Sequence, residues 1–156
     1  MVEKFDEIDH RMVELLTADG RMSINELASR AGVARTTAYT RLERLQANGV
    51  ITGFTALIDH AKAGHPVAAL ILVNLEQHSW SRARDELRRL PGLQHLFLTS
   101  GTFDAVLLVR MADLHALRDV ILVELHGMPL VKSTQTVFVL DEEDVRRRRP
   151  HRADST

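Results

Sequence analysis

The chain contains no cysteine. This absence excludes disulfide bonds, thiolate nucleophiles and thiolate-ligated metal sites, and it agrees with a reducing cytoplasm. No apolar run reaches the length of roughly 18 residues that a membrane span needs. The first residues, MVEKFDEIDHRM, are acidic and amphipathic, whereas a secretory signal is basic and then apolar. We therefore expect a cytoplasmic protein with no membrane partner.

Aromatic residues and net charge are also scarce. Aromatic side chains make up 4% of the 156 residues, so aliphatic ones must fill the core of one ordinary domain or two small ones. The formal net charge is −1, and residues 1–60 hold 7 basic against 9 acidic residues. Total charge therefore gives no support for nucleic-acid binding. Residues 34–47, however, contain three arginines and one glutamate, which is a locally basic composition.

Signals for catalysis and metal binding are missing as well. The eight histidines include no pair spaced i, i+4 on a predicted helix. No G-x-S-x-G, G-x-G-x-x-G or P-loop motif occurs. Glu142, Glu143 and Asp144 lie in a hydrophilic run that is more typical of a solvated end than of an acid/base pair. We therefore expect no enzyme, and no catalytic residue, metal or cofactor.

Residues 22–51 have the pattern of two short helices joined by a tight turn. Ser23, with Glu26 three positions later, predicts an N-cap within a capping box. Gly32 supplies the left-handed conformation that a sharp turn requires. The second helix is expected from about Ala34 to Ala47. Its apolar stripe is Ala38, Leu42 and Leu45.

The other face of this second helix carries side chains that are able to bond DNA. In the major groove, arginine bonds guanine or phosphate, and threonine bonds bases or touches the thymine methyl. The charged tips of Arg35 and Arg41 are expected to extend outward. An ordinary helical hairpin with a solvated polar face has the same periodicity, so the pattern alone leaves both interpretations open. The candidate DNA-binding residues are Arg35, Thr36, Thr37, Tyr39, Thr40, Arg41 and Arg44.

The segment GVARTTAYTRLERLQANGVITGFTALIDHAKAG resembles the corresponding segment of the Lrp/AsnC, or feast/famine, family of prokaryotic transcription regulators. A helix predicted at residues 7–18 matches the family too, and it completes a three-helix, winged-helix-like domain. One departure is Ala34, where the family usually has serine, so the second helix lacks an N-cap hydroxyl unless Thr36 or Thr37 caps it later. The matching positions are Arg41, Leu42, Leu45, Gly49, Val50, Ile51, Phe54, Ala56 and Asp59.

The remaining sequence alternates strand and helix patterns. Residues 51–59 are rich in strand formers and predict a strand that links the two halves, followed by a punctuated connector. The order of the later elements, β-α-β-β-α-β, is that of the ferredoxin-like fold. These elements are a strand at 67–75 buried on both faces, a helix capped by Ser79 or Ser81 and ending near Leu90, strands at 94–99 and 103–111, a helix capped by Asp113 with Leu114, Leu117, Ile121 and Leu125 inward, and a strand at 131–140.

Residues 66–141 resemble the regulatory domain of the same family, mainly through the hairpin TSGTFDA and the last strand. The resemblance implies that both meet at a subunit interface that binds a small effector, often an amino acid. Asp104 is able to accept an α-ammonium group and free hairpin amides a carboxylate. Alternatively, Gly101 only makes the turn and Asp104 caps it. The candidate effector-binding residues are Thr99, Ser100, Gly101, Thr102, Asp104, Thr134 and Thr136.

Together these patterns predict an α+β protein that regulates transcription. Its expected partners are double-stranded DNA, further copies of the chain in a homodimer or an octamer, and a small effector. The alternative is an amino-acid-sensing module whose helical half docks protein instead of DNA. No motif identifies the effector, the operator or the direction of regulation. The expected parts are a helix-turn-helix DNA-binding domain at 1–50, a linker at 51–65, a ferredoxin-like effector-binding and oligomerisation domain at 66–141, and a charged, disordered tail at 142–156, in which Arg146–Arg149 either attract phosphate or only solubilise the chain.

Overall fold

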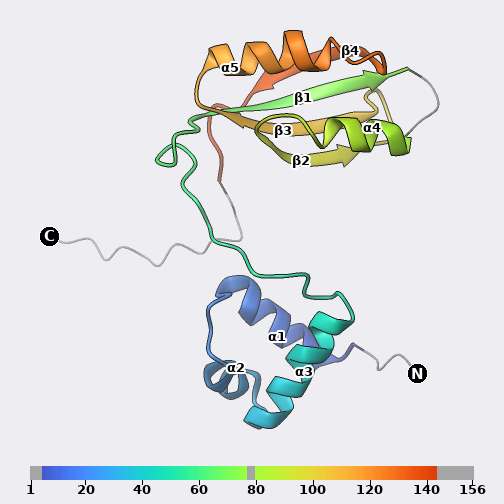
Figure 1. The fold of residues 1–156 in the computed structure, drawn as a ribbon. Helices are drawn as coiled ribbons and strands as arrows, with labels where there is room; N and C mark the ends of the chain where they lie inside the picture. The colour runs from blue at the N-terminus through green and yellow to red at the C-terminus, as the bar shows by residue number, and fades with distance from the viewer. Residues whose placement is uncertain (1–4, 77–79, 144–156) are drawn as a thin grey trace, which may run out of the picture. The chain divides into compact units, whose positions relative to one another are not determined.

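Three helices form the first compact unit, which extends to Leu57: α1 (Glu7–Ala18), α2 (Ile24–Ala31) and α3 (Arg35–Ala47) (Figure 1). The computed structural model describes residues 5–76 and 80–143. Each helix turns one apolar stripe inward, as its sequence period predicts. The fully buried centre of this small core is made by Met12, Leu27 and Ala38, one residue from each helix.

Local hydrogen bonds set the entry to α2 and its exit. The Ser23 Oγ accepts a hydrogen bond from the Glu26 amide at 3.2 Å, so the predicted N-cap is confirmed, but the reciprocal bond that would complete the predicted capping box does not form. The Glu26 carboxylate lies 3.7 Å from Arg30. Gly32 ends the helix with φ of 73° in the left-handed region, as predicted. Helices α2 and α3 therefore meet at the sharp turn that the sequence indicates.

Helix α3 begins without a side-chain cap. Its first residue is Arg35, and the preceding Ala34 makes no side-chain hydrogen bond to the helix. The alternative of a later cap at Thr36 or Thr37 is wrong, because both residues already lie inside the first turn. The turn at Gly32, and not a side-chain cap, therefore determines that α3 starts at Arg35.

The linking strand predicted at residues 51–59 does not form, so this prediction is wrong. A strand needs a second backbone to satisfy its amide and carbonyl groups. Within the described part of the chain, the only sheet pairs four other strands and leaves this segment out. Phe54, Leu57 and Ile58 are accordingly exposed.

The second compact unit, Ile58–Glu143, contains one antiparallel sheet with strand order β2-β3-β1-β4. This order and the alternation of strands and helices confirm the ferredoxin-like topology (Figure 1). The elements are β1 (Val67–Leu75), α4 (Trp80–Leu87), β2 (Leu93–Leu98), β3 (Ala105–Met111), α5 (Leu114–Asp119), the π-helix η1 (Val120–Leu125) and β4 (Val131–Phe138).

The helices of this unit cover one face of the sheet. Ile71 of β1 and Leu107 of β3 are cross-strand partners, and both are fully buried together with Leu87 of α4 and Leu125 of η1. The prediction that β1 is buried on both faces is wrong. Its other face, at Leu70 for example, is only half-buried because no helix of this unit lies over it.

Details of the predicted caps and stripes also differ. Asp113 caps α5 by accepting from the Ala116 amide at 2.8 Å, as predicted, but Leu114 is exposed rather than inward. Ser81 lies inside α4, so its predicted capping role is wrong, whereas Ser79 lies outside the described residues. The last strand ends before residue 140. Glu142, expected at a solvated end, forms an ion pair with the largely buried Arg110.

Candidate functional site

The exposed side of α3 forms an open hollow of about 370 Å³. Five of the seven candidate DNA-binding residues line it, and they come from three successive turns of the one helix. Arg35 and Tyr39 do not line the hollow, but both are exposed on the same helix. The lining residues are Thr36, Thr37, Thr40, Arg41 and Arg44.

Two arginines of this hollow turn toward the start of α1. Arg41 donates to both carboxylate oxygens of Asp6 at 2.8 Å and to Asp9 at 2.9 Å. Arg44 donates to the other oxygen of Asp9 at 2.6 Å. The expectation that the charged tip of Arg41 extends outward is therefore wrong, because the acidic first turn of α1 lies within its reach. Whether either arginine touches DNA stays a prediction.

Asp6 and Asp9 also form the capping box of α1. Each carboxylate accepts a hydrogen bond from the other residue's backbone amide, at 3.0 and 3.1 Å. The hydrogen bond from Arg41, followed by the Asp9 amide, holds the pKa of Asp6 below its ordinary 3.8. The same contacts with Asp6 and then Asp9 raise the pKa of Arg41. Asp6 and Arg41 are therefore both ionised near neutral pH.

The remaining polar groups of α3 are exposed. Thr40 donates its hydroxyl hydrogen to the Thr36 carbonyl at 3.0 Å, which leaves the Thr40 oxygen as an acceptor. A hydrogen bond to Glu43, one turn away, raises the pKa of the Tyr39 phenol above 10.0. Tyr39 is therefore neutral near physiological pH, and its ring is 55% exposed.

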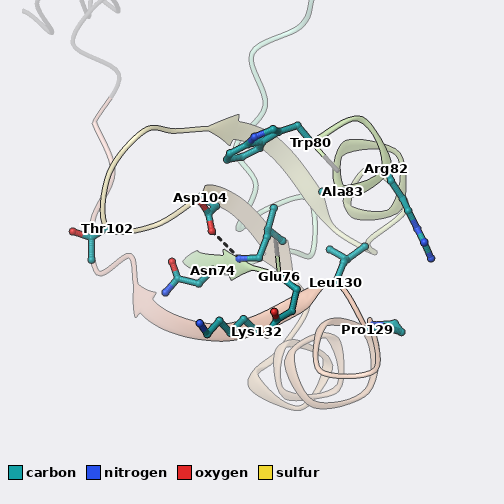
Figure 2. Close-up of a pocket in the computed structure, with 11 residues that line it drawn as sticks. Asn74, Glu76, Trp80, Arg82, Ala83, Thr102, Asp104, Pro129, Leu130 and Lys132 are labelled. Atoms are coloured by element: carbon teal, nitrogen blue, oxygen red, sulfur yellow. Dashed lines mark hydrogen bonds between the residues drawn. The ribbon is translucent and has the colours of Figure 1, made fainter. Parts of the chain in front are cut away.

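A second, larger opening lies in the ferredoxin-like unit, beside the end of β1. It is a pocket of about 740 Å³, and Figure 2 shows the side chains around it. Of the candidate effector-binding residues, only Thr102 and Asp104 line it. The full lining consists of Asn74, Leu75, Glu76, Trp80, Arg82, Ala83, Thr102, Asp104, Pro129, Leu130 and Lys132.

Asp104 joins the hairpin to β1. Its Oδ2 accepts from the Leu75 amide at 2.8 Å (Figure 2), and its own amide donates to the Val73 carbonyl at 2.9 Å. The Leu75 amide is available because the β1–β3 pairing ends at Val73 and Ala105, before Leu75 would find a partner on β3. The Asp104 carboxylate thus bonds β1 rather than capping the hairpin turn, and it also borders the pocket, so its role toward an ammonium group stays a prediction.

The other candidate effector residues are engaged elsewhere. Thr99 donates its hydroxyl hydrogen to the Phe103 carbonyl at 2.6 Å and so closes the hairpin turn. Thr134 lies 3.0 Å from the His126 Nε2. Thr136 pairs with Ile71, whose side chain belongs to the helix-covered face. Ser100 and Gly101 belong to the hairpin turn and do not line the pocket.

Comparison with known proteins gives these two units a family. Residues 5–46 match the family model of the AsnC-type helix-turn-helix domain. Residues 68–148 match the family model of the Lrp/AsnC ligand binding domain. The chain belongs to the Lrp/AsnC family of transcription regulators. The first match spans α1 to α3, and the second contains the pocket beside β1.

Relatives within the Lrp/AsnC family resemble most of the chain. An uncharacterised HTH-type transcriptional regulator of Pyrococcus horikoshii is 36% identical over 85% of this chain and 84% of its own length. The proline dehydrogenase transcriptional activator of Rhizobium radiobacter is 33% identical, over 88% and 92%. A solved feast or famine regulatory protein from M. tuberculosis, complexed with L-methionine, superimposes with a TM-score of 0.81 at 28% identity, over 89% and 94%.

Sequence reasoning did not predict several residues that lie at the two candidate sites. Asp6 and Asp9, which bind Arg41 and Arg44, were not among its candidate residues. It also missed the cations and the indole of the pocket, at Arg82, Lys132 and Trp80. The one sequence feature that marks this region is Trp80, the only tryptophan of the chain, and the structure shows it 49% exposed beside the pocket.

Other classes of site find no further support. Among residues 5–76 and 80–143, no group of three or more histidine, aspartate or glutamate side chains is arranged to hold a metal ion. Within the same residues, no helix has the length and apolar character needed to cross a membrane.

Proposed function

We propose that this Lrp/AsnC protein reads specific DNA sites with the exposed side of α3 and responds to an amino acid bound in the ferredoxin-like unit. The observation that carries the DNA half is the row of Thr36, Thr37 and Thr40 around an open hollow on the second helix of the matched helix-turn-helix. Their hydroxyl groups suit base edges and phosphates. Arg35 and Tyr39 are the exposed neighbours that extend this surface.

The proposed DNA-binding form contains at least two copies of the chain. One recognition helix covers only a half-site, and paired helices read half-sites about one helical turn apart or a multiple of it. The sheet face without helices supports self-association. Its exposed Phe97 and Val137 flank half-buried Leu72 and Leu108, which is an apolar surface that a second copy would cover. We therefore propose a homodimer as the basic assembly, and an octamer as the larger assembly that such dimers could form.

The proposed effector is an amino acid held in the pocket beside β1. Glu76 and Asp104 provide carboxylates for an ammonium group, and Lys132 provides a cation for a carboxylate. Trp80 and Leu130 add apolar surface for a side chain. The complex of the M. tuberculosis relative with L-methionine supports this class of ligand. The roles predicted for Thr99, Ser100, Gly101, Thr134 and Thr136 stay predictions.

Two measurements test the proposal. A gel-shift titration with the DNA upstream of its own gene should show retardation that excess random DNA competes poorly. Each of the twenty amino acids is titrated in turn while the fluorescence of Trp80, the only tryptophan of the chain, is recorded. Only the effector should change this fluorescence. Equal competition by random DNA would contradict sequence-specific binding and favour the alternative, in which the helical half docks protein. As a DNA-binding protein it would act in the cytoplasm, and no catalytic step is proposed.

A further inference from the structure

The hollow on α3 contains an internally neutralised charge cluster. Two cations, Arg41 and Arg44, face two anions, Asp6 and Asp9, at N–O distances from 2.6 to 2.9 Å. The Asp9 side chain is fully buried, whereas those of Arg41 and Arg44 are 21% and 20% exposed. The formal charge of the four groups is zero. The locally basic composition of residues 34–47 therefore does not produce an equally basic surface.

This arrangement matters because sequence-blind DNA binding is almost purely electrostatic. Each phosphate neutralised by a protein cation adds to the affinity for every sequence and makes that affinity fall more steeply with salt. Threonine hydroxyls act differently, since their hydrogen bonds to base edges depend on the sequence. Without a carboxylate to offset their charge, Arg41 and Arg44 would raise the affinity for DNA of every sequence by a similar amount.

Stability alone does not account for the cluster. A buried ion pair is weak support for a fold, because removing two charges from water costs about as much as their attraction returns. Asp9 nevertheless binds both guanidinium groups and so holds them beside α1. Asp6, whose side chain is 43% exposed, holds Arg41 from the solvent side.

We propose that Asp6 and Asp9 are specificity-determining residues that suppress sequence-blind DNA binding by neutralising Arg41 and Arg44. They act through the arginines and do not touch the DNA. The threonines of the hollow are then left to discriminate between sequences. This inference rests on the proposed function, because it concerns the same DNA-binding surface, but it adds a role for the first turn of α1.

Asp6→Asn is the mildest test, because it removes one partly exposed charge and leaves Asp9 in place. Asp9→Asn removes the charge shared by both arginines. Glu14→Gln is the matched control, since it makes the same charge change at an exposed position of α1 outside the cluster. Thermal melting of each variant first establishes that it is folded, and Asp6→Asn carries the test if Asp9→Asn does not fold.

The first readout is binding to a random duplex and to the upstream DNA at several salt concentrations. Each released arginine should add about one phosphate contact, so the affinity lost between 50 and 200 mM salt should grow by roughly threefold per contact. Random-duplex affinity at low salt should rise by a similar factor, and the preference for the upstream DNA should fall. A uniform loss on both DNAs with an unchanged salt slope would mean that the carboxylates only support the fold.

The second readout is elution from immobilised heparin, which needs no specific DNA site. Asp6→Asn and Asp9→Asn should elute at higher salt than Glu14→Gln and the wild-type protein. Identical elution of all three variants would overturn the neutralising role, whatever the wild-type protein does with DNA. Failure of the wild-type protein to prefer the upstream DNA would instead overturn the proposed function, so the two failures are distinguishable.

Discussion

The Arg44 guanidinium lies 2.6 Å from the buried carboxylate of Asp9, although 35 positions separate the two residues in the sequence. This contact connects the start of α1 to the last turn of α3, and it has consequences for the stability of the helical unit as well as for DNA binding.

Arg44→Ala should destabilise the helical unit. It leaves the buried Asp9 with Arg41 as its remaining cation, so we expect a loss of about 2 kcal/mol, below the 3–5 kcal/mol for a buried pair that is broken completely. Urea denaturation of the variant measures this loss. Arg35→Ala, at an exposed position of the same helix, is the control and should change stability by less than about 0.5 kcal/mol. Equal stability of both variants would contradict the role of Arg44 in the cluster.

Thr36→Ala should weaken binding to the specific site more than binding to random DNA. A lost hydrogen bond of about 1 kcal/mol corresponds to roughly a fivefold change in the dissociation constant. Thr40→Ala should behave in the same way. Thr17→Ala is a close control, because Thr17 makes the same kind of hydrogen bond to a carbonyl four residues earlier, at 2.8 Å, but lies on α1. Parallel losses on specific and random DNA would exclude a base-reading role.

The contribution of Asp6 to stability should disappear in acid. Because Arg41 lowers the pKa of Asp6 in the folded protein, the stabilisation is present above the ordinary pKa of 3.8 and is lost as the pH falls through the lower, folded value. The wild-type protein should therefore exceed Asp6→Asn in stability at pH 7, and the gap should close below about pH 4. Denaturation midpoints of both proteins across this range provide the measurement, and a gap that is constant with pH would contradict it.

Tyr39 should titrate above pH 10.0, because its phenol is hydrogen-bonded to Glu43 and the phenolate would lie beside that carboxylate. It is the only tyrosine of the chain, so the phenolate absorbance reports this residue alone. Glu43→Gln should lower the midpoint toward 10.0. An unchanged midpoint in that variant would show that Glu43 is not the cause.

Much of the fold follows from local sequence signals. The bounds of α1 and α3 are set by apolar period and by turn residues such as Gly32, and the ferredoxin-like order follows from the spacing of strands and turns. The strand expected at residues 51–59 fails because strand formation depends on a pairing partner, which a propensity does not supply. Leu117 and Leu125 of the predicted stripe are buried, whereas Leu114 is the first residue of α5 and is exposed at the helix start.

The candidate sites were predicted less completely, for a physical reason. The helical period determines which residues lie on the same face of α3. The sequence could therefore predict the residues that line the hollow. The direction of the Arg41 and Arg44 side chains depends on α1, whose carboxylates approach only after the helices pack. The pocket beside β1 likewise gathers Trp80, Thr102 and Lys132 from three separate segments, and no local pattern encodes that meeting.

The solitary indole and the solitary phenol of this chain lie in different compact units, Trp80 beside the pocket and Tyr39 on α3. Two intrinsic optical reporters therefore observe the two compact units separately. Mixing the DNA-free protein with an amino acid can follow the emission of Trp80 and the absorbance of Tyr39 in the same experiment. The time at which each unit responds to a metabolite is thus accessible without any attached label.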